Sequence, residues 1–454
     1  MQINACVKLG WLPILTLGAI ASVYFMSLDT PPTASASFLT ALQLGNRQIW
    51  IQAAGRSLCQ VASGLIYFYI PLVFVNQVGL SATSVGLSVG ISSLAGVAGH
   101  LLGGALADSP RFGRKATLSL SAGLGVLVSL VLAVTQTLPM LIVASLLLGL
   151  SVGFYWTAAD AAVMDVTLPE ERHQAFAIMS VAENVGVGIG ILGGGVLLTI
   201  ANQRHELLFL GCGLIFLLFL VLVQTAIAET RQVTTAPHTP TQGFLIALQD
   251  KALLTFILAN LLFTTYVALV TTTVPLYFTN FIPAMGANPN ASLSSTASLF
   301  TWCYIGVGAV AQLPIAQAFS AVPRVRVLMI AMLLSSFGFC LLWVTGTFAA
   351  YQYWTGVAAL CVMAIASVTY KPFAAAIVSE LAPENLRGAY VAVSSQCWAI
   401  GYFVGPLVGG WAMDQPAIVA HNFWLAVAAS TSVGLLVLRL FETQRIKLEI
   451  EPLA

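Results

Sequence analysis

Long apolar segments recur along the whole sequence, many of them holding 20 or more residues with hardly a charge. A helix rises about 1.5 Å per residue, so such a segment can cross a hydrocarbon layer about 30 Å thick. Only helices and closed barrels pair every backbone polar group inside lipid. The segments are continuously apolar rather than alternating, which favours helices over barrel strands. The sequence therefore predicts an all-α membrane protein.

Composition excludes several other classes of protein. Charged residues make up 7% of the chain, against about 25% in ordinary globular proteins, and mean hydropathy is +0.93. So few charges cannot cover a soluble surface. A net charge of +1 excludes nucleic acid as a partner. The seven cysteines stand singly in apolar runs without metal-ligand spacing, so we interpret them as small buried residues and expect neither a metal nor a cofactor.

The apolar pattern predicts twelve spans in two groups of six. The polar segment 229–250 is expected to be a cytoplasmic linker between six-helix bundles at 46–228 and 251–443, with a C-terminal tail at 444–454. The expected spans are 49–75, 81–106, 116–136, 139–163, 174–200, 207–228, 252–279, 294–318, 327–346, 352–376, 388–412 and 420–441.

Residues 1–45 form an expected N-terminal extension, hydrophobic over 9–26 and polar after that. The hydrophobic part fits a signal peptide, an extra transmembrane helix or an interfacial helix. A cleaved signal would place the following segment outside, against the charge pattern below. We predict that residues 1–25 are dispensable, since Met26 begins a polar stretch typical of a cytoplasmic N-terminus.

An internal repeat divides the chain into two related halves. Arg172 and Arg387 lie 215 residues apart, and both precede glycine-rich apolar segments. The sequences IPLVFVN, ending at Asn76, and VPLYFTN, ending at Asn280, are a second matching pair. The repeat therefore predicts two pseudo-symmetric six-helix bundles. At the same 215-residue offset, Gly186, Gly190, Gly194 and Gly195 match Gly401, Gly405, Gly409 and Gly410.

Basic residues predict the orientation, because loops on the cytoplasmic side carry an excess of lysine and arginine. They fall on one set of alternate loops, and Arg204 is the exception on the opposite loops. We therefore expect the termini of the twelve-helix body in the cytoplasm and the chain in the plasma (inner) membrane. The residues are Arg47, Arg111, Arg114, Lys115, Arg172, Arg231, Lys251, Arg324, Arg326, Arg387, Arg445 and Lys447.

The loop between spans two and three, with Asp108 followed by RFGRK at 111–115, resembles the signature loop of the major facilitator superfamily. Its departure is the inserted pair Ser109-Pro110. The segment with Gly405-Pro406 is similar to the superfamily's antiporter motif, but stands in span eleven rather than span five. The resemblance covers residues ~45–445. It implies a non-enzymatic secondary transporter, with two bundles alternating about a central small-molecule site. We further expect a monomer.

The resemblance also implies that contacts of the signature loop hold the cytoplasmic side shut. From the residues alone, Asp108 can cap a neighbouring helix N-terminus, while the basic residues pair with acids or lipid headgroups. The alternative is that the positive charges of the loop only determine the orientation of the chain in the membrane. The equivalent stretch of the second half, 317–326, contains no acid, so we expect a one-sided latch. The candidate gating residues are Asp108, Arg111, Gly113, Arg114, Lys115, Asp165, Arg172 and Arg387.

Glu183 is the leading candidate for a proton-carrying group. It stands nine residues into span five, about 14 Å deep, where an ionisable group costs at least about 2.5 kcal/mol and normally faces a cavity or partner. Its counterpart in the repeat is Trp398. The alternative is a hydrogen-bonded residue that joins helices. Glu183 shares a helix face with Gly186, Gly190 and Gly194, and we expect these glycines and Gly401, Gly405 and Gly409 to pack against neighbouring helices.

Other polar residues within the spans are candidates for substrate contact or gating. Arg56, with Gln60 one turn further on, would neutralise an acid, meet an anionic substrate or reach the interface. Asp160 and Lys371, in equivalent spans four and ten, would form an inter-domain ion pair or reach headgroups. The resemblance adds residues of the expected cavity, which suit an organic molecule: Tyr67, Tyr155, Trp156, Asn260, Tyr266, Trp302, Tyr304 and Tyr370. Trp398, the counterpart of Glu183 in the repeat, is a further cavity candidate.

The leading functional hypothesis is proton-coupled efflux of a small organic molecule by antiport. Proton-coupled uptake of a nutrient by symport is the alternative within transport. An integral membrane transferase is a different class of protein. It is disfavoured because Asp160 and Asp165, the closely spaced carboxylates near one interface, have no metal-binding cluster around them. No Walker loop is present for ATP-driven transport.

Overall fold

The computed structural model describes residues 46–168, 171–230, 245–285, 293–383 and 386–450. The expected hydrophobic segment at 9–26 and most of the expected linker lie outside these ranges. The unit that begins at Arg47 is compact, and its described residues are helical with short connections and no strand. Twelve helices among them are long and apolar enough to cross a membrane, which confirms the twelve predicted spans.

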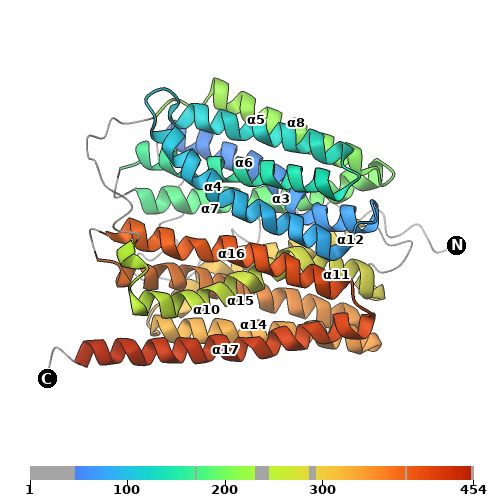
Figure 1. The fold of residues 1–454 in the computed structure, drawn as a ribbon, viewed down its shortest axis with the longest axis vertical. Helices are drawn as coiled ribbons and strands as arrows, with labels where there is room; N and C mark the ends of the chain where they lie inside the picture. Colours follow the sequence, from blue (N-terminus) through green and yellow to red (C-terminus); the bar gives the residue numbers. More distant parts are fainter. Residues whose placement is uncertain (1–45, 169–170, 231–244, 286–292, 384–385, 451–454) are drawn as a thin grey trace, which may run out of the picture. The chain divides into compact units, whose positions relative to one another are not determined.

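The first six spans are single helices, here called the first set (Figure 1). Their ends lie within a few residues of the predicted ends. The helices are α3 (Arg47–Asn76), α4 (Ala82–Asp108), α5 (Gly113–Val134), α6 (Leu138–Asp165), α7 (Arg172–Ile200) and α8 (His205–Thr225).

The second set contains two spans interrupted by π-helical turns, η1 (Leu269–Thr273) and η3 (Phe300–Gly306). The apolar pattern does not reveal them, because a π turn changes hydrogen bonding without changing hydrophobicity. The remaining helices are α10 (Lys251–Ala268), α11 (Val274–Phe281), α12 (Leu293–Leu299), α13 (Val307–Ala318), α14 (Arg324–Thr347), α15 (Gln352–Leu381), α16 (Arg387–Met413) and α17 (Ala417–Ile450).

Helix packing repeats between the two sets, as the internal repeat predicts. In the first set α3 packs on α7, α4 on α6, and α5 on α8. In the second set α10 packs on α16, α13 on α15, and α14 on α17. The sets meet mainly where α4 packs on α16 and α7 on α12. The predicted pair of pseudo-symmetric six-helix bundles is therefore the observed architecture.

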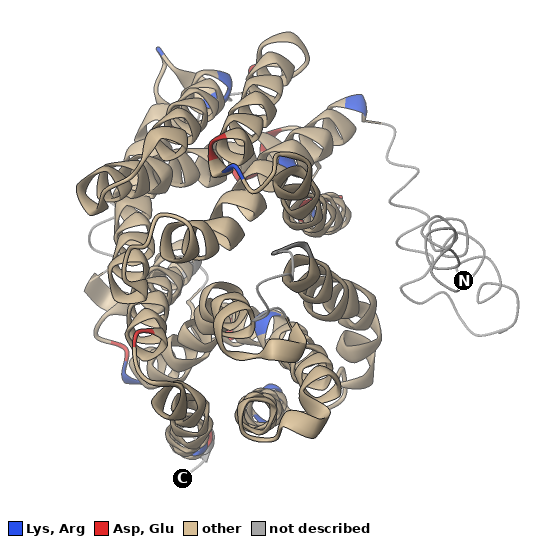
Figure 2. Cartoon of the chain, turned by 90° about the vertical axis from the view of Figure 1, so that its right-hand side faces the viewer, with Lys and Arg blue, Asp and Glu red and all other residues tan. Residues whose placement is uncertain are grey.

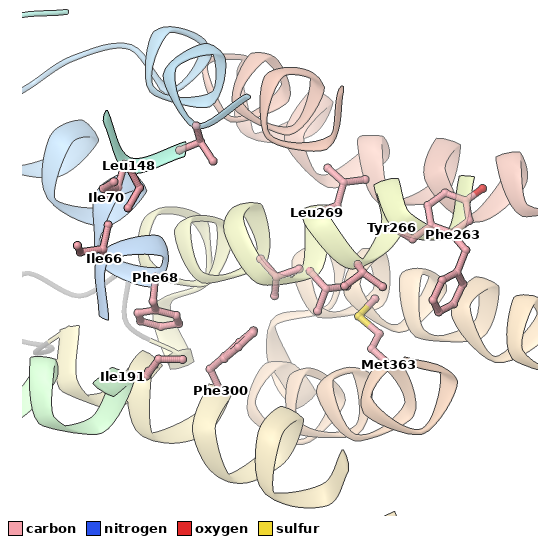
Figure 3. Packing of buried hydrophobic residues seen from close by; sticks show 14 of the residues in the cluster. Ile66, Phe68, Ile70, Leu148, Ile191, Phe263, Tyr266, Leu269, Phe300 and Met363 are labelled. Carbon is pink, nitrogen blue, oxygen red and sulfur yellow. The ribbon is translucent and has the colours of Figure 1, made fainter. Parts of the chain in front are cut away.

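A continuous apolar core joins the two sets. Phe68 of α3 lies 5.4 Å from Phe300 of η3, measured between ring centroids, and Ile191 of α7 lies beside them (Figure 3). Viewed along the helices, most of the ribbon carries neither acidic nor basic residues (Figure 2). The few charges within the spans therefore stand out as candidate functional groups.

The repeated glycines lie at equivalent helix contacts. A Cβ added at Gly190 of α7 would overlap the carbonyl oxygen of Val61 in α3. A Cβ added at Gly405 of α16 would lie 3.0 Å from the carbonyl oxygen of Thr265 in α10. The same two contacts continue through Gly186 and Gly194 against α3, Gly401 against α10 and Gly409 against η1. Small residues thus allow close backbone approach.

Candidate functional site

Three charged residues lie at one level of the spans. The end of the unit where α3 begins and α6 ends is here called the terminal end, and the opposite end the far end. Arg56 lies nine residues into α3, Glu183 eleven into α7, and Lys371 ten before the end of α15. Helical rise places all three about 14–17 Å from the terminal end. This level is called the central site.

Arg56 is the centre of a charge cluster in the first set. It is 5% exposed and forms an ion pair with Asp160 of α6. Its second amino group lies 4.0 Å from the carboxylate of Glu183. The guanidinium carbon lies 4.8 Å from the ring centroid of Trp156, close enough for a cation–π contact. Of the alternatives for Arg56, the structure shows the one in which it pairs with an intramembrane acid, Asp160.

The two carboxylates of this cluster differ from the arginine in exposure. The side chains of Asp160 and Glu183 are 40% and 36% exposed, although both lie within spans. Arg56 takes Asp160 as its direct partner, so Glu183 keeps the more distant contact. The side chain of Glu183 is therefore not enclosed by protein, and its charge is only partly compensated.

The expected ion pair between Asp160 and Lys371 is wrong. Asp160 pairs with Arg56, because α6 brings it to α3 within the same set. The ammonium of Lys371 lies 5.3 Å from the ring centroid of Trp398. Across the two sets Lys371 attracts Glu183 electrostatically instead. Lys371 is also exposed, so the central site presents an accessible cation on its second wall.

Several expected cavity residues are packed inside the sets. Tyr370 is 1% exposed and stacks on Phe263 with ring centroids 3.6 Å apart. Tyr266 hydrogen-bonds Ser430, and Tyr155 is 3% exposed. These side chains are buried because their helix faces point to neighbouring helices of the same set. Asn260 and Gln60 are buried as well, whereas Tyr67, Trp156, Tyr304 and Trp398 are partly exposed and Trp302 is 56% exposed.

The signature loop forms a network at the terminal end of the first set. Arg114 contacts the carboxylates of Asp108 at 2.7 Å and Asp165 at 3.0 Å. Glu229, rather than Asp108, caps α5, accepting the backbone amides of Arg114 and Lys115 at 3.0 Å each. Asp108 contacts the side chain of Arg114, and its expected role as a helix cap stays a prediction.

Three further loop candidates lie within the described residues. Gly113 has a φ of +75°, a conformation that favours glycine, and it leaves room for the Glu229 carboxylate. Arg111 and Arg172 are exposed. Nothing is described of the Arg387 side chain.

The second set has its own network at the terminal end, so the expected one-sided latch is wrong. Glu380 of α15 pairs with Arg324 and lies 3.2 Å from Arg445. Glu442 of α17 lies 3.4 Å from Arg326. The acids come from the ends of neighbouring helices rather than from the loop. The repeated Glu-Thr pairs, at 229–230 and 442–443, were the sequence signal for this symmetry.

At the far end, a carboxylate of one set caps a helix of the other. Asp414, directly after α16, accepts the backbone amides of Ala82 and Thr83 at 2.8 Å each. About midway along the same two helices, the hydroxyl of Ser93 in α4 donates to the carbonyl of Ala399 in α16 at 2.8 Å. This junction could not be predicted from the sequence, because an aspartate that ends one helix gives no sign of which other helix it meets.

Comparison with known proteins identifies the family. The sequence matches the profile of the Major Facilitator Superfamily twice, over residues 53–281 and 276–452. The chain belongs to this superfamily. It is therefore a multi-pass membrane transporter and not an enzyme, as the signature loop and the repeat predict.

Individual superfamily relatives are distant. The chain is 25% identical over 387 residues to a Na(+), Li(+), K(+)/H(+) antiporter of Planococcus maritimus, covering 80% of this chain and 88% of that protein. It is 24% identical to the multidrug resistance protein MdtH of Salmonella typhimurium, with coverages of 79% and 84%. A crystal structure of the nucleoside transporter NupG superposes with a TM-score of 0.74 at 14% identity, covering 87% and 99%. That likeness supports the fold alone.

Proposed function

We propose that the protein is a proton-coupled transporter of a small organic molecule, with Glu183 as the proton-binding group. The observation that carries this proposal is the cluster of two carboxylates around Arg56. One arginine cannot neutralise two carboxylates, and uncompensated charge within a membrane span is costly. A proton on Glu183 removes the excess negative charge of the first set, while Asp160 keeps the direct ion pair.

Alternating access follows from the two-set architecture. In this conformation the sets are joined at the far end by Asp414 and at mid-span by the contact between Ser93 and Ala399. We propose that bundles 46–228 and 251–443 move about the central site, so that the far-end junction breaks as the terminal end closes. In this proposal the chain lies in the inner membrane, and the linker 229–250 and the tail 444–454 are cytoplasmic. The basic residues on one set of alternate loops support this orientation.

Antiport is the first proposed mode. A positively charged solute and a proton would compete for Glu183, so binding of one would release the other. The names of two relatives, a cation/H(+) antiporter and a multidrug resistance protein, support this mode and the direction of efflux.

Symport is the second candidate mode, and Lys371 favours it. No acid among the described residues lies within ion-pair distance of Lys371. When Glu183 is protonated, the central site therefore has a net positive charge, which an anionic solute would balance. A proton and an anion would then move together.

A proteoliposome assay tests proton coupling and its mode. The purified full chain is reconstituted with a pH-sensitive dye inside, a pH gradient is imposed, and a panel of organic cations, anions, zwitterions and Na⁺ is added. We expect at least one compound to change the rate of proton movement, with opposite signs for antiport and symport. A gradient that no compound disturbs would contradict the proposal.

A further inference from the structure

The two walls of the central site carry opposite net charges. In the first set one positive group, Arg56, faces two negative groups, Asp160 and Glu183. In the second set the charged group at this level is Lys371. With every group ionised, the first wall is therefore negative by one charge and the second wall positive by one.

The environment of Lys371 differs from that of Arg56 although each cation lies near a tryptophan. Arg56 contacts the ring of Trp156 and has a carboxylate as direct partner. Lys371 contacts the ring of Trp398, and the described part of the chain places no carboxylate within ion-pair distance of it. A cation–π contact covers one side of an ammonium and supplies no negative charge. Lys371 thus keeps donors free for an anion.

Glu183 is a poor permanent partner for Lys371. Its nearest cation is Arg56 of its own set, at 4.0 Å, and its attraction to Lys371 acts over a longer distance. Protonation of Glu183 would remove even that attraction. An unpaired lysine at this depth is costly to enclose, so closure of the terminal end around a protonated site requires an anion from elsewhere.

We propose that the transported molecule carries an anionic group, such as a carboxylate, that binds Lys371 beside Trp398. The rest of the molecule then determines the mode of transport. A singly charged anion would balance Lys371 when Glu183 is protonated, which is symport. A zwitterion would place its cationic end at the ionised Glu183 and balance both walls, which allows exchange for a proton. The need for an anion on closure and the step to a mode rest on the proposed function, whereas the lack of a carboxylate partner for Lys371 among the described residues does not.

Matched compounds test the anionic group directly. The purified full chain in nanodiscs is titrated with phenylalanine, 3-phenylpropionate and phenethylamine, and with leucine, 4-methylpentanoate and isoamylamine. Thermal stabilisation and tryptophan fluorescence report binding. We expect an acid-bearing member to bind roughly tenfold more tightly than its matched amine, the gain of one charge-assisted contact. Lys371→Gln should remove this difference, and Lys371→Arg should retain it.

The control variant is Lys251→Gln, which removes a lysine at the start of α10 outside the central site. It should bind like the wild type. The proposal is overturned if no acid binds more tightly than its matched amine, including the case in which nothing binds. It is also overturned if Lys371→Gln keeps the preference.

Proton flux separates this proposal from the proposed function. Acid binding that depends on Lys371 without compound-dependent proton flux would support the anion site and contradict proton coupling. Proton flux that amines drive equally well in the wild type and in Lys371→Gln would support proton coupling and overturn the anion site.

Discussion

Asp414 accepts hydrogen bonds from both the backbone amide and the side-chain hydroxyl of Thr83, at 2.8 and 2.5 Å. The two residues belong to different sets, so this helix cap forms only while the far ends of the sets are together. An N-terminal cap satisfies amides that the helix leaves unpaired, and its carboxylate also interacts favourably with the helix dipole. The pair therefore stabilises one conformation of the transporter relative to the others.

Asp414→Ala should shift the protein away from this conformation. Loss of a cap costs about 1 kcal/mol, which changes the equilibrium roughly fivefold. The measurement is the maleimide labelling rate of Ser93→Cys in a background without native cysteines, since Ser93 contacts α16 in this state. Labelling should accelerate several-fold. Gln415→Ala is the matched control, because the side-chain amide of Gln415 donates to the carbonyl of Trp411 in the same set and not to the other set. Equal labelling rates in the two variants would contradict the role of Asp414 in holding the far ends of the two sets together.

Two glycine substitutions should have different effects. A Cβ at Gly86 would overlap the carbonyl of Pro406 in the other set, and one at Gly190 would overlap Val61 within the first set. Overpacking costs about 1–3 kcal/mol. Gly86→Ala should accelerate labelling of Ser93→Cys, while Gly190→Ala should lower the melting temperature. Gly104→Ala, with open space around it, should change neither. A melting temperature unaffected by Gly190→Ala would argue against the contact.

Gly113→Ala should destabilise the signature loop. The left-handed φ of +75° costs a residue with a Cβ about 1 kcal/mol or more, and the new methyl group would collide with the carboxylate of Glu229. The melting temperature of the purified protein should fall. Gly123→Ala, inside α5 with open space around it, should raise it or leave it unchanged because alanine favours helix. An equal fall in melting temperature in Gly113→Ala and Gly123→Ala would contradict the special requirement for glycine at position 113.

Arg56 should contribute to the stability of the protein, because it compensates the negative charge of Asp160 and, in part, of Glu183 inside the first set. Arg56→Gln leaves the carboxylates of Asp160 and Glu183 without their cation. Breaking a buried ion pair costs about 3–5 kcal/mol, and partial exposure of the acids reduces that to about 1–3 kcal/mol. Adding Asp160→Asn to Arg56→Gln should therefore recover part of the lost melting temperature. A double variant no more stable than Arg56→Gln alone would show that the pair is not the cause.

The spans and their pairing could be predicted from the sequence because hydrophobicity determines them directly. The apolar segment expected at 116–136, for example, is α5 from Gly113 to Val134. The 215-residue repeat likewise anticipated that Gly190 and Gly405 make equivalent contacts. Such features depend on composition, period and spacing, which a single sequence contains.

Partners of individual polar side chains could not be predicted. The sequence left Asp160 either to pair with Lys371 or to reach headgroups, but it meets Arg56, 104 residues away along the chain. Asp414 and Thr83 are 331 residues apart. Which helix faces meet is decided by packing of the whole unit, so the apolar pattern left these contacts open. Burial of Tyr370 against Phe263 has the same origin.

The most direct test of the account compares Glu183→Gln with the wild type for one compound that drives proton flux. Proteoliposomes are assayed both for accumulation under a pH gradient and for exchange of labelled against unlabelled compound without a gradient. The account predicts that Glu183→Gln keeps exchange but loses gradient-driven accumulation, because the amide cannot bind or release the proton. Accumulation at the wild-type level in Glu183→Gln would contradict the central claim.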